Sequence, residues 1–137
     1  MSLEYNRTLT EVFAHSCKAY ADSPAFTCMN HTLSYAELDQ KSAQFAAYLQ
    51  QHTQLKPGDR IAVQLPNILQ YPVVVYGALR AGLIVVNTNP LYTASEIKHQ
   101  LNDSGAKALV VLANIAKNAA SVIKDTSVEH VIVTELA

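Results

Sequence analysis

The side chains best suited to acid–base or metal chemistry in this sequence are five histidines, and they are scattered. They are His15, His31, His52, His99 and His130. Two histidines on one helix can share a metal when they stand three or four residues apart, and no pair here has that spacing. We therefore predict no catalytic residue and no metal ligand among them, and we expect each imidazole to be solvated or to cap a helix.

Nucleotide chemistry would need a glycine-rich turn, because backbone amides at the start of a helix hold phosphate. The chain has only four glycines, at positions 58, 77, 82 and 105. Gly77 and Gly82 have the outer spacing of a P-loop, but Leu83 and Ile84 stand where lysine and serine or threonine are needed. No Gly-x-Ser-x-Gly elbow of a hydrolase occurs either. We predict that this chain binds no cofactor by itself.

Three tyrosines, Tyr71, Tyr76 and Tyr92, are candidates for lining a pocket that takes an apolar ligand. Tyrosines in helices and at strand ends more often pack in the core or at its rim. The sequence leaves both interpretations open.

The bulk composition favours one soluble globular domain. The chain has 137 residues, of which 50% are hydrophobic, and a net charge of -1. This charge gives no basic surface for nucleic acid or anionic lipid, so we predict no nucleic-acid partner. Cys17 and Cys28 are too few for a disulfide framework, which favours a reduced, cytoplasmic setting.

The sequence also argues against membrane insertion and secretion. The most apolar window, residues 68–86, contains Gln70, Pro72 and Arg80. A buried helix, a glycine turn and a strand explain it better than a transmembrane segment. Residues 1–7 are polar, so we expect no secretory signal there.

Capping signals in the sequence predict where the helices begin, and these helices must position any site. Three pairs of a threonine or serine with a glutamate three residues later are capping boxes: Thr8 with Glu11, Ser34 with Glu37, and Thr93 with Glu96. They predict helices over residues 9–21, 35–51 and 94–104, the last ending in a left-handed cap at Gly105. Asn67 is predicted to cap a fourth helix that runs to residue 81, and a fifth follows Asn114 over residues 115–124.

The strands define the fold class. Residues 25–29 and 32–34 are predicted to form an antiparallel hairpin around an Asn30-His31 turn. Residues 61–65, 84–86, 108–112 and 131–133 are continuous apolar runs, typical of strands covered on both faces. We therefore predict an α/β fold, with a mostly parallel sheet covered by helices on both faces and a short hairpin near the N-terminus.

These elements carry a series of short motifs. Their residues are Ser34, Tyr35, Glu37, Leu38, Pro66, Asn67, Arg80, Ala81, Gly82, Asn89, Pro90, Tyr92, Thr93, Glu96 and Gly105. In their order, from about residue 9 to residue 134, the motifs resemble the adenylate-forming (AMP-binding) superfamily. The last motifs, at residues 87–111, narrow the resemblance to bacterial long-chain acyl-CoA synthetases. In that family these motifs are mainly scaffold, so the resemblance assigns them no catalytic or cofactor-binding role.

The resemblance implies a parent enzyme that activates a fatty acid with ATP and Mg²⁺, forms an acyl-adenylate and pyrophosphate, and transfers the acyl group to CoA. The family's phosphate loop, its later acidic motifs and its lysine-bearing lid have no counterpart in residues 1–137. We expect residues 1–137 to be the N-terminal subdomain of a larger adenylate-forming domain, truncated and inactive alone. The parent is expected to be cytoplasmic, with peripheral membrane association implied by the resemblance.

Three alternatives remain open from the sequence. Asn89-Pro90 and Tyr92-Thr93 also resemble coumarate-type relatives, so the parent could act on aromatic or shorter acids. The alternation of helices and strands alone fits a free-standing flavodoxin-like binding or regulatory domain. An open sheet edge could also pair with another chain, including a second copy of this one.

Overall fold

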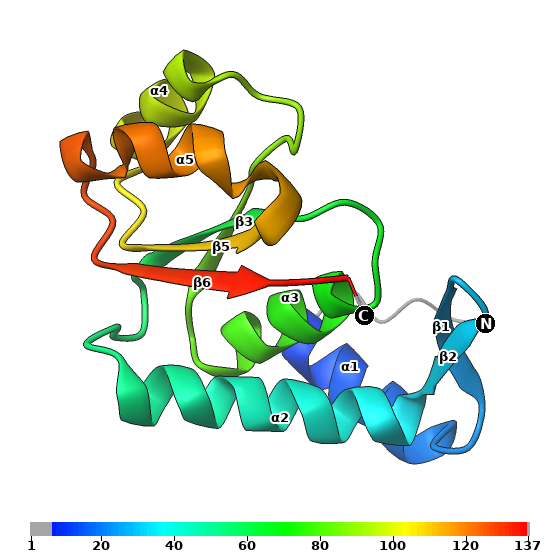
Figure 1. Cartoon of the computed structure of the whole chain (residues 1–137). Coiled ribbons are helices and arrows are strands. Elements are labelled where there is room, and N and C mark those ends of the chain that lie inside the picture. Colours follow the sequence, from blue (N-terminus) through cyan, green and yellow to red (C-terminus); the bar gives the residue numbers. More distant parts are fainter. Residues whose placement is uncertain (1–6, 137) are drawn as a thin grey trace.

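Helices and strands alternate along the chain in the computed structural model, which describes residues 7–136 (Figure 1). The elements are α1 (Leu9–Ala19), β1 (Pro24–Cys28), β2 (His31–Ser34), α2 (Tyr35–His52), β3 (Arg60–Gln64), α3 (Gln70–Arg80), β4 (Ile84–Asn87), α4 (Ala94–Ser104), β5 (Ala108–Leu112), α5 (Ala116–Val122) and β6 (His130–Thr134). Short 3₁₀ turns, η1 (Ala113–Ile115) and η2 (Ile123–Asp125), flank α5. The expectation of no secretory signal falls largely on residues 1–6, which lie outside the described residues.

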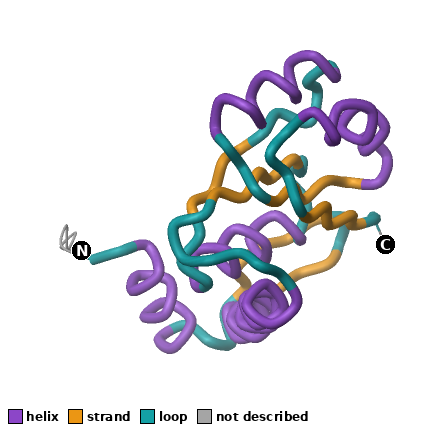
Figure 2. Tube along the Cα trace, turned by 90° about the vertical axis from the view of Figure 1, so that its left-hand side faces the viewer, coloured by secondary structure: helices purple, strands orange, loops and turns teal. Residues whose placement is uncertain are grey.

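The main sheet has four parallel strands in the order β4-β3-β5-β6, and helices cover both of its faces (Figures 1 and 2). On one face, Ala46 of α2 and Val74 of α3 pack with Ile61 of β3 in one buried cluster. On the other, Leu101 of α4 and Ala119 of α5 pack in a second. The predicted fold class is confirmed.

The edge strands differ from the prediction that every parallel strand is covered on both faces. All five residues of β5 are buried, as predicted. By contrast, Ile84 of β4 is 48% exposed, and Val131 and Val133 of β6 are 48% and 53% exposed. The prediction was wrong for these strands because the strand order puts both of them at the edges of the described sheet, which composition alone does not reveal.

The hairpin forms as predicted, but its turn lies one residue earlier. Strands β1 and β2 pair antiparallel with Cys28 opposite His31, so Met29 and Asn30 are the two turn residues. Both have positive φ, 51° and 65°. A two-residue turn of this kind needs left-handed backbone at both positions, which asparagine tolerates well and methionine poorly. The sequence pattern therefore pointed to the wrong pair.

Two capping boxes are confirmed and two other helix starts differ. The Ser34–Glu37 and Thr93–Glu96 boxes are complete, whereas Thr8 accepts one bond from the Glu11 amide at 3.1 Å. The predicted Asn67 cap is wrong, since α3 begins at Gln70 and no side chain of the described residues caps it. The predicted fifth helix is shorter: η1 and η2 take its first and last turns and leave α5 seven residues.

The Ser34–Glu37 box makes part of the stability dependent on pH. The pKa of Glu37 is lowered, first because the Ser34 amide donates to its carboxylate at 3.1 Å and then because of the Ser34 side chain. A lowered folded-state pKa contributes stability above the unfolded value, near 4.5, and that contribution is lost as pH falls further. We expect Glu37→Gln to lower the melting temperature at pH 7, with the gap to the native chain narrowing as the pH falls below 4.5. A gap that stays constant would contradict this prediction.

Candidate functional site

The topology points to the carboxyl edge of the sheet as the place for a site. The chain leaves β3 through α3 to β4 on one side, then returns across β3 through α4 to β5 on the other. The strand order therefore reverses between β3 and β5. Ligands of open α/β sheets bind beyond the carboxyl ends of strands at such a switch point.

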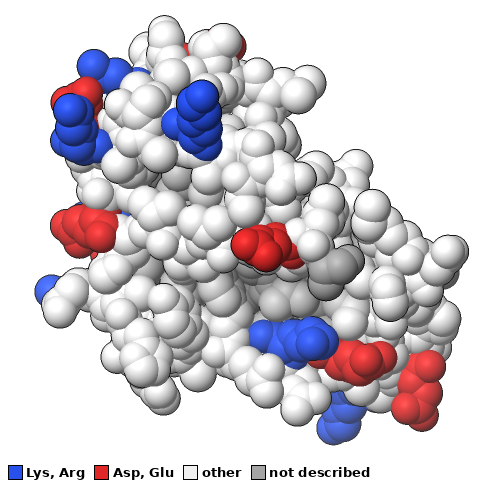
Figure 3. All heavy atoms as spheres, viewed as in Figure 1, with Lys and Arg blue, Asp and Glu red and all other residues white. Residues whose placement is uncertain are grey.

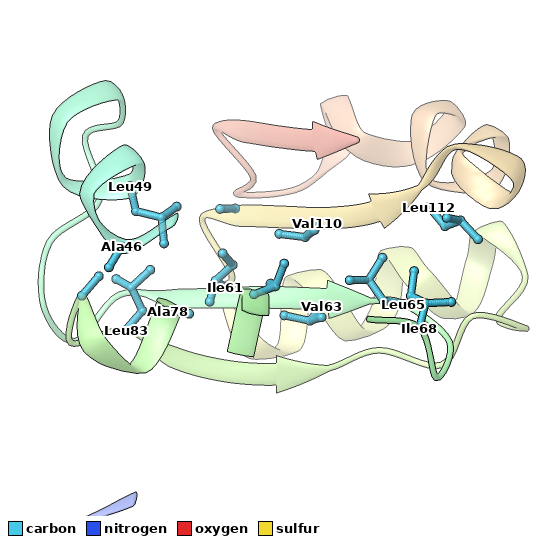
Figure 4. Packing of buried hydrophobic residues seen from close by; sticks show 13 residues of the cluster. Ala46, Leu49, Ile61, Val63, Leu65, Ile68, Ala78, Leu83, Val110 and Leu112 are labelled. Carbon is cyan, nitrogen blue, oxygen red and sulfur yellow. The ribbon is translucent and has the colours of Figure 1, made fainter. Parts of the chain in front are cut away.

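The switch point of this chain is filled by apolar side chains. Leu65 and Ile68 follow β3 and are 5% and 8% exposed, and Leu112 at the end of β5 is 5% exposed. Figure 4 shows these three side chains at the carboxyl ends of the two strands. Because these three side chains are apolar, they offer a ligand no hydrogen-bonding group. The polar groups of this edge therefore belong to neighbouring residues.

Those polar groups gather beside β4, around the loop of residues 87–90, which we call the clamped loop. The Tyr71 hydroxyl of α3 donates to Asn87 Oδ1 at 2.7 Å. From the opposite face of the sheet, Gln100 Nε2 of α4 donates to the Asn87 carbonyl oxygen at 2.9 Å. Three elements in all hold this loop, because Gln64 Nε2 of β3 donates to the carbonyl oxygen of Asn89 at 3.2 Å.

Gln64 is the residue of this edge that our sequence analysis missed. Its side chain is fully buried at the end of β3, and its Oε1 has no hydrogen-bond partner among the described residues. A buried, unpaired amide oxygen costs free energy, so its presence needs a reason. The signal was available: Gln64 is the one polar side chain within the buried run 61–65.

The clamped loop contains two asparagines, a threonine and a proline. Thr88 is 3% exposed, and its amide donates to the Val63 carbonyl oxygen at 2.9 Å. This arrangement holds backbone at the carboxyl edge of the sheet.

Removing one clamp bond has a modest expected cost. We predict that Tyr71→Phe lowers the free energy of unfolding by about 1 kcal/mol, because one net hydrogen bond is lost and the Asn87 side chain loses its partner. Urea denaturation checks the magnitude, and amide hydrogen exchange of residues 87–90 should become faster. Tyr48→Phe, on the 43% exposed Tyr48 of α2, is the matched control and should change neither quantity. Equal effects from both variants would refute the clamp.

The three candidate tyrosines do not line one pocket. Tyr71 packs on the α2 and α3 side of the sheet, and Tyr92 on the α4 and α5 side. Tyr76 stacks on Phe13 of α1 with ring centroids 4.0 Å apart, and its pKa is raised, first of all by burial. The core-packing interpretation is thus the one that the structure favours.

His99 lines a pocket together with acidic side chains. That pocket lies on α4, has a volume of about 470 Å³ and includes Tyr92, Glu96 and Asp103. Among the described residues, no group of three or more histidine, cysteine or acidic side chains is arranged to hold a metal ion. Cys17 and Cys28 are both free.

The glycines do not fit a phosphate cradle at this edge. Gly58, Gly82 and Gly105 have left-handed φ of 91°, 80° and 67°, but each lies just before a strand, at the amino edge of the sheet. Gly77 lies within α3, against α2. These three glycine turns therefore lie at the end of the sheet opposite to the switch point. That this chain binds no nucleotide stays a prediction.

The residues of the sequence motifs divide between the two edges. Pro66, Asn67, Asn89, Pro90, Tyr92, Thr93 and Glu96 follow the carboxyl ends of β3 and β4. Ser34, Tyr35, Glu37 and Leu38 open α2, and the hairpin before them touches the first group through Cys28 Sγ, 3.7 Å from the Asn67 carbonyl oxygen. Two helices end at the amino edge of the sheet: α3 at Arg80, followed by Ala81 and Gly82, and α4 just before Gly105.

Arg80 has the densest contacts of the amino-edge group. Its guanidinium donates to the Asp39 carbonyl oxygen at 2.9 Å and forms an ion pair with the Asp39 carboxylate. It also lies 5.3 Å from the centre of the Phe13 ring, where a planar cation is attracted to the π face. Arg80 thereby ties α1, α2 and α3 together, which is a structural role.

These features define a doubly wound α/β fold in which side chains from three elements hold a loop at the carboxyl edge of the sheet. The chain belongs to the AMP-binding enzyme family, which matches it over residues 13–137. No helix among residues 7–136 is long and apolar enough to cross a membrane, and the window 68–86 consists of α3, a turn and β4, as predicted.

Among its relatives are curated long-chain-fatty-acid–CoA ligases. That of Salmonella typhimurium is 52% identical over 130 residues, which is 95% of this chain and 23% of the relative. The ligase of Escherichia coli O6:H1 is 51% identical over 130 residues, again 95% of this chain and 23% of the relative. A solved long-chain-fatty-acid–CoA ligase from Archaeoglobus fulgidus superposes with a TM-score of 0.87 at 25% identity, over 97% of this chain and 28% of that one. The chain thus spans about a quarter of their length.

Proposed function

We propose that this chain is the N-terminal scaffold of an ATP-dependent long-chain fatty-acid–CoA ligase. The parent would convert fatty acid, ATP and CoA into acyl-CoA, AMP and pyrophosphate through an acyl-adenylate. The observation that carries this proposal is identity of 52% along 95% of the chain to a protein of that name. Such identity spans the whole scaffold, whereas the fold alone is shared by many functions.

The chain's own contribution would be positioning. Two of the motif residues at the carboxyl edge, Asn89 and Pro90, belong to the clamped loop, and the clamp has bonds from both faces of the sheet. A rigid loop at this edge is what an enzyme needs to orient groups supplied by another part of the protein. ATP, Mg²⁺, CoA and the fatty acid would be held through the rest of the parent.

The proposal is tested by comparing the 137-residue chain with the intact parent. We expect fatty-acid-dependent exchange of labelled pyrophosphate into ATP from the parent and none above background from the chain. Activity of the chain alone would contradict its scaffold role. If the parent activates aromatic or short-chain acids in preference to palmitate, the proposed substrate is wrong, but the proposed reaction class stands.

Two further properties belong to the same proposal. The parent would act in the cytoplasm, with peripheral association at the membrane, and cell fractionation checks both. The chain alone would self-associate only through its open sheet edges, which light scattering after size exclusion checks. Its net charge of -1 gives no electrostatic support for nucleic-acid binding.

A further inference from the structure

Two glutamine side chains at the clamped loop share an unusual pattern of hydrogen bonds. Gln64 Nε2 of β3 donates to the Asn89 carbonyl oxygen at 3.2 Å, and Gln100 Nε2 of α4 donates to the Asn87 carbonyl oxygen at 2.9 Å. The other half of each amide, the Oε1 atom, is buried and accepts no hydrogen bond among the described residues. Within residues 7–136, these two oxygens are the buried side-chain polar atoms that have no partner.

Reversing either amide would not give its oxygen a partner. A glutamine amide has a nitrogen that only donates and an oxygen that only accepts. In a reversed amide, Oε1 would face a backbone carbonyl oxygen, and two acceptors form no hydrogen bond. The observed orientation is therefore the better one, and each oxygen still needs a donor. A buried acceptor without a donor costs free energy, so two of them at one loop call for a common explanation.

Both oxygens lie on the α4 side of the sheet. Ile61 and Val63 of β3 pack in the cluster with α2 and α3, whereas Ala62 packs in the cluster with α4 and α5. Side chains alternate along a strand, so Gln64 lies on the same side as Ala62. Gln100 belongs to α4 itself, and the two carbonyl oxygens that the amides hold are two residues apart in the clamped loop. The two amides therefore reach the loop as neighbours.

We propose that Gln64 and Gln100 hold one buried water molecule, which donates one hydrogen to each Oε1. A water molecule has two hydrogens to donate, and the pair presents two acceptors. Buried waters in proteins typically bond to polar groups that have no other partner. This water would join β3 to α4 beside the clamped loop and complete the hydrogen bonding of both amides. The site concerns this chain's own side chains and goes beyond the proposed function.

A monovalent cation would also bind to amide oxygens, but the charges of the chain do not favour one. A cation taken out of water is costly unless a nearby negative charge balances it. Among residues 7–136 no acidic side chain is buried, and Glu96 of α4 already binds Thr93 in the capping box. Figure 3 shows acidic and basic side chains on the outer surface of the part that α4 and α5 form. A neutral donor therefore fits the two oxygens better.

A high-resolution crystal structure of the 137-residue chain tests the site directly. We expect one water molecule within roughly 2.5–3.0 Å of both Oε1 atoms, the usual range for a hydroxyl that donates to oxygen. A protein donor on either oxygen, or no water that reaches both of them, would overturn the inference. So would a peak that rubidium replaces after a soak in rubidium chloride, because it would assign a monovalent cation to the site.

Substitution tests the sharing of the water in solution. We expect a nuclear Overhauser cross-peak between the bound water and the carbon-bound Cγ hydrogens of Gln100, with the sign typical of the protein itself. Gln64→Met removes one acceptor and keeps the length of the side chain, so it should abolish this cross-peak although Gln100 is unchanged. Gln70→Met is the matched control, because Gln70 of α3 also donates to a backbone carbonyl oxygen, that of Glu135, at 2.9 Å. This control should leave the cross-peak as it is.

A cross-peak that persists in folded Gln64→Met would show that the water is not shared and would overturn the inference. If Gln64→Met does not fold, the reciprocal variant Gln100→Met, at a half-buried position, decides. It should abolish the water cross-peak of the Gln64 hydrogens, and persistence there would have the same meaning. None of these measurements depends on acyl-CoA synthesis, so failure of the water site is distinguishable from failure of the proposed function.

Discussion

Replacing Gly77 by valine is expected to destabilise this protein by about 3 kcal/mol, as overpacking in a tight helix contact does. Gly77 lies in α3 where that helix crosses α2. A Cβ at this position would lie 2.7 Å from Phe45 Cδ1 and 2.9 Å from the carbonyl oxygen of Ser42. The phenyl ring can turn aside, but the Ser42 carbonyl belongs to the α2 backbone, so the two helices would have to separate.

Separation of α2 and α3 would reach the carboxyl edge. These two helices cover one face of the sheet, and α3 carries Tyr71, whose hydroxyl holds the clamped loop. We therefore expect Gly77→Val to speed hydrogen exchange of residues 87–90 as well as to lower global stability. The smaller variant Gly77→Ala should lie between, since it gains helix propensity and still meets the Ser42 oxygen.

Urea denaturation measures the loss, and Leu79→Val on the same helix is the control. That variant introduces the same β-branched side chain in α3 at a partly buried position, and we expect it to cost about 1 kcal/mol or less. If Gly77→Val costs no more than Leu79→Val, the close approach of the helices does not limit the residue at position 77.

Local signals in the sequence predicted the elements well where the responsible contacts are local. The Thr93–Glu96 capping box and the left-handed cap at Gly105 both form within a few residues of chain. Each therefore depends on side-chain and backbone chemistry that the sequence displays. The Ser34–Glu37 box is a second case of the same kind.

The wrong predictions concern features that depend on how elements distant in the sequence are arranged in the fold. Asn67 has the right chemistry for a cap, but residues 65–69 separate β3 from α3, and the Ile68 amide donates to the Pro66 carbonyl oxygen before α3 begins at Gln70. The exposure of Val131 follows from strand order, which apolar composition does not encode. In both cases the neighbouring element sets the outcome.

The candidate site shows the same division. Its motif residues could be located through the family resemblance, because their order along the chain is visible in the sequence. The clamp could not, since Tyr71, Asn87 and Gln100 come from three elements that meet only in the folded sheet. Gln64 could have been found by its polarity in a buried strand, but its contact with Asn89 joins residues 25 apart.

Leu101→Ala is the second large effect that we expect, at about 3 kcal/mol in the free energy of unfolding. Leu101 is fully buried in the cluster between α4, α5 and the sheet. Removing a buried leucine side chain loses its transfer free energy and leaves a cavity that close-packed neighbours fill only in part. Leu91→Ala is the matched control, because Leu91 is 87% exposed and should cost less than about 0.5 kcal/mol.

The same substitution tests whether Leu101 only stabilises the fold around the site or also affects the reaction. Leu101 is one residue after Gln100, which bonds the clamped loop, so loosening α4 should also speed hydrogen exchange of residues 87–90. In the intact parent, a purely supporting role predicts that Leu101→Ala lowers the melting temperature while kcat at temperatures well below melting stays within about two-fold. A large loss of kcat in a fully folded Leu101→Ala parent would show instead that α4 sets the geometry of the reacting groups, because stability alone cannot account for slower turnover in molecules that remain folded.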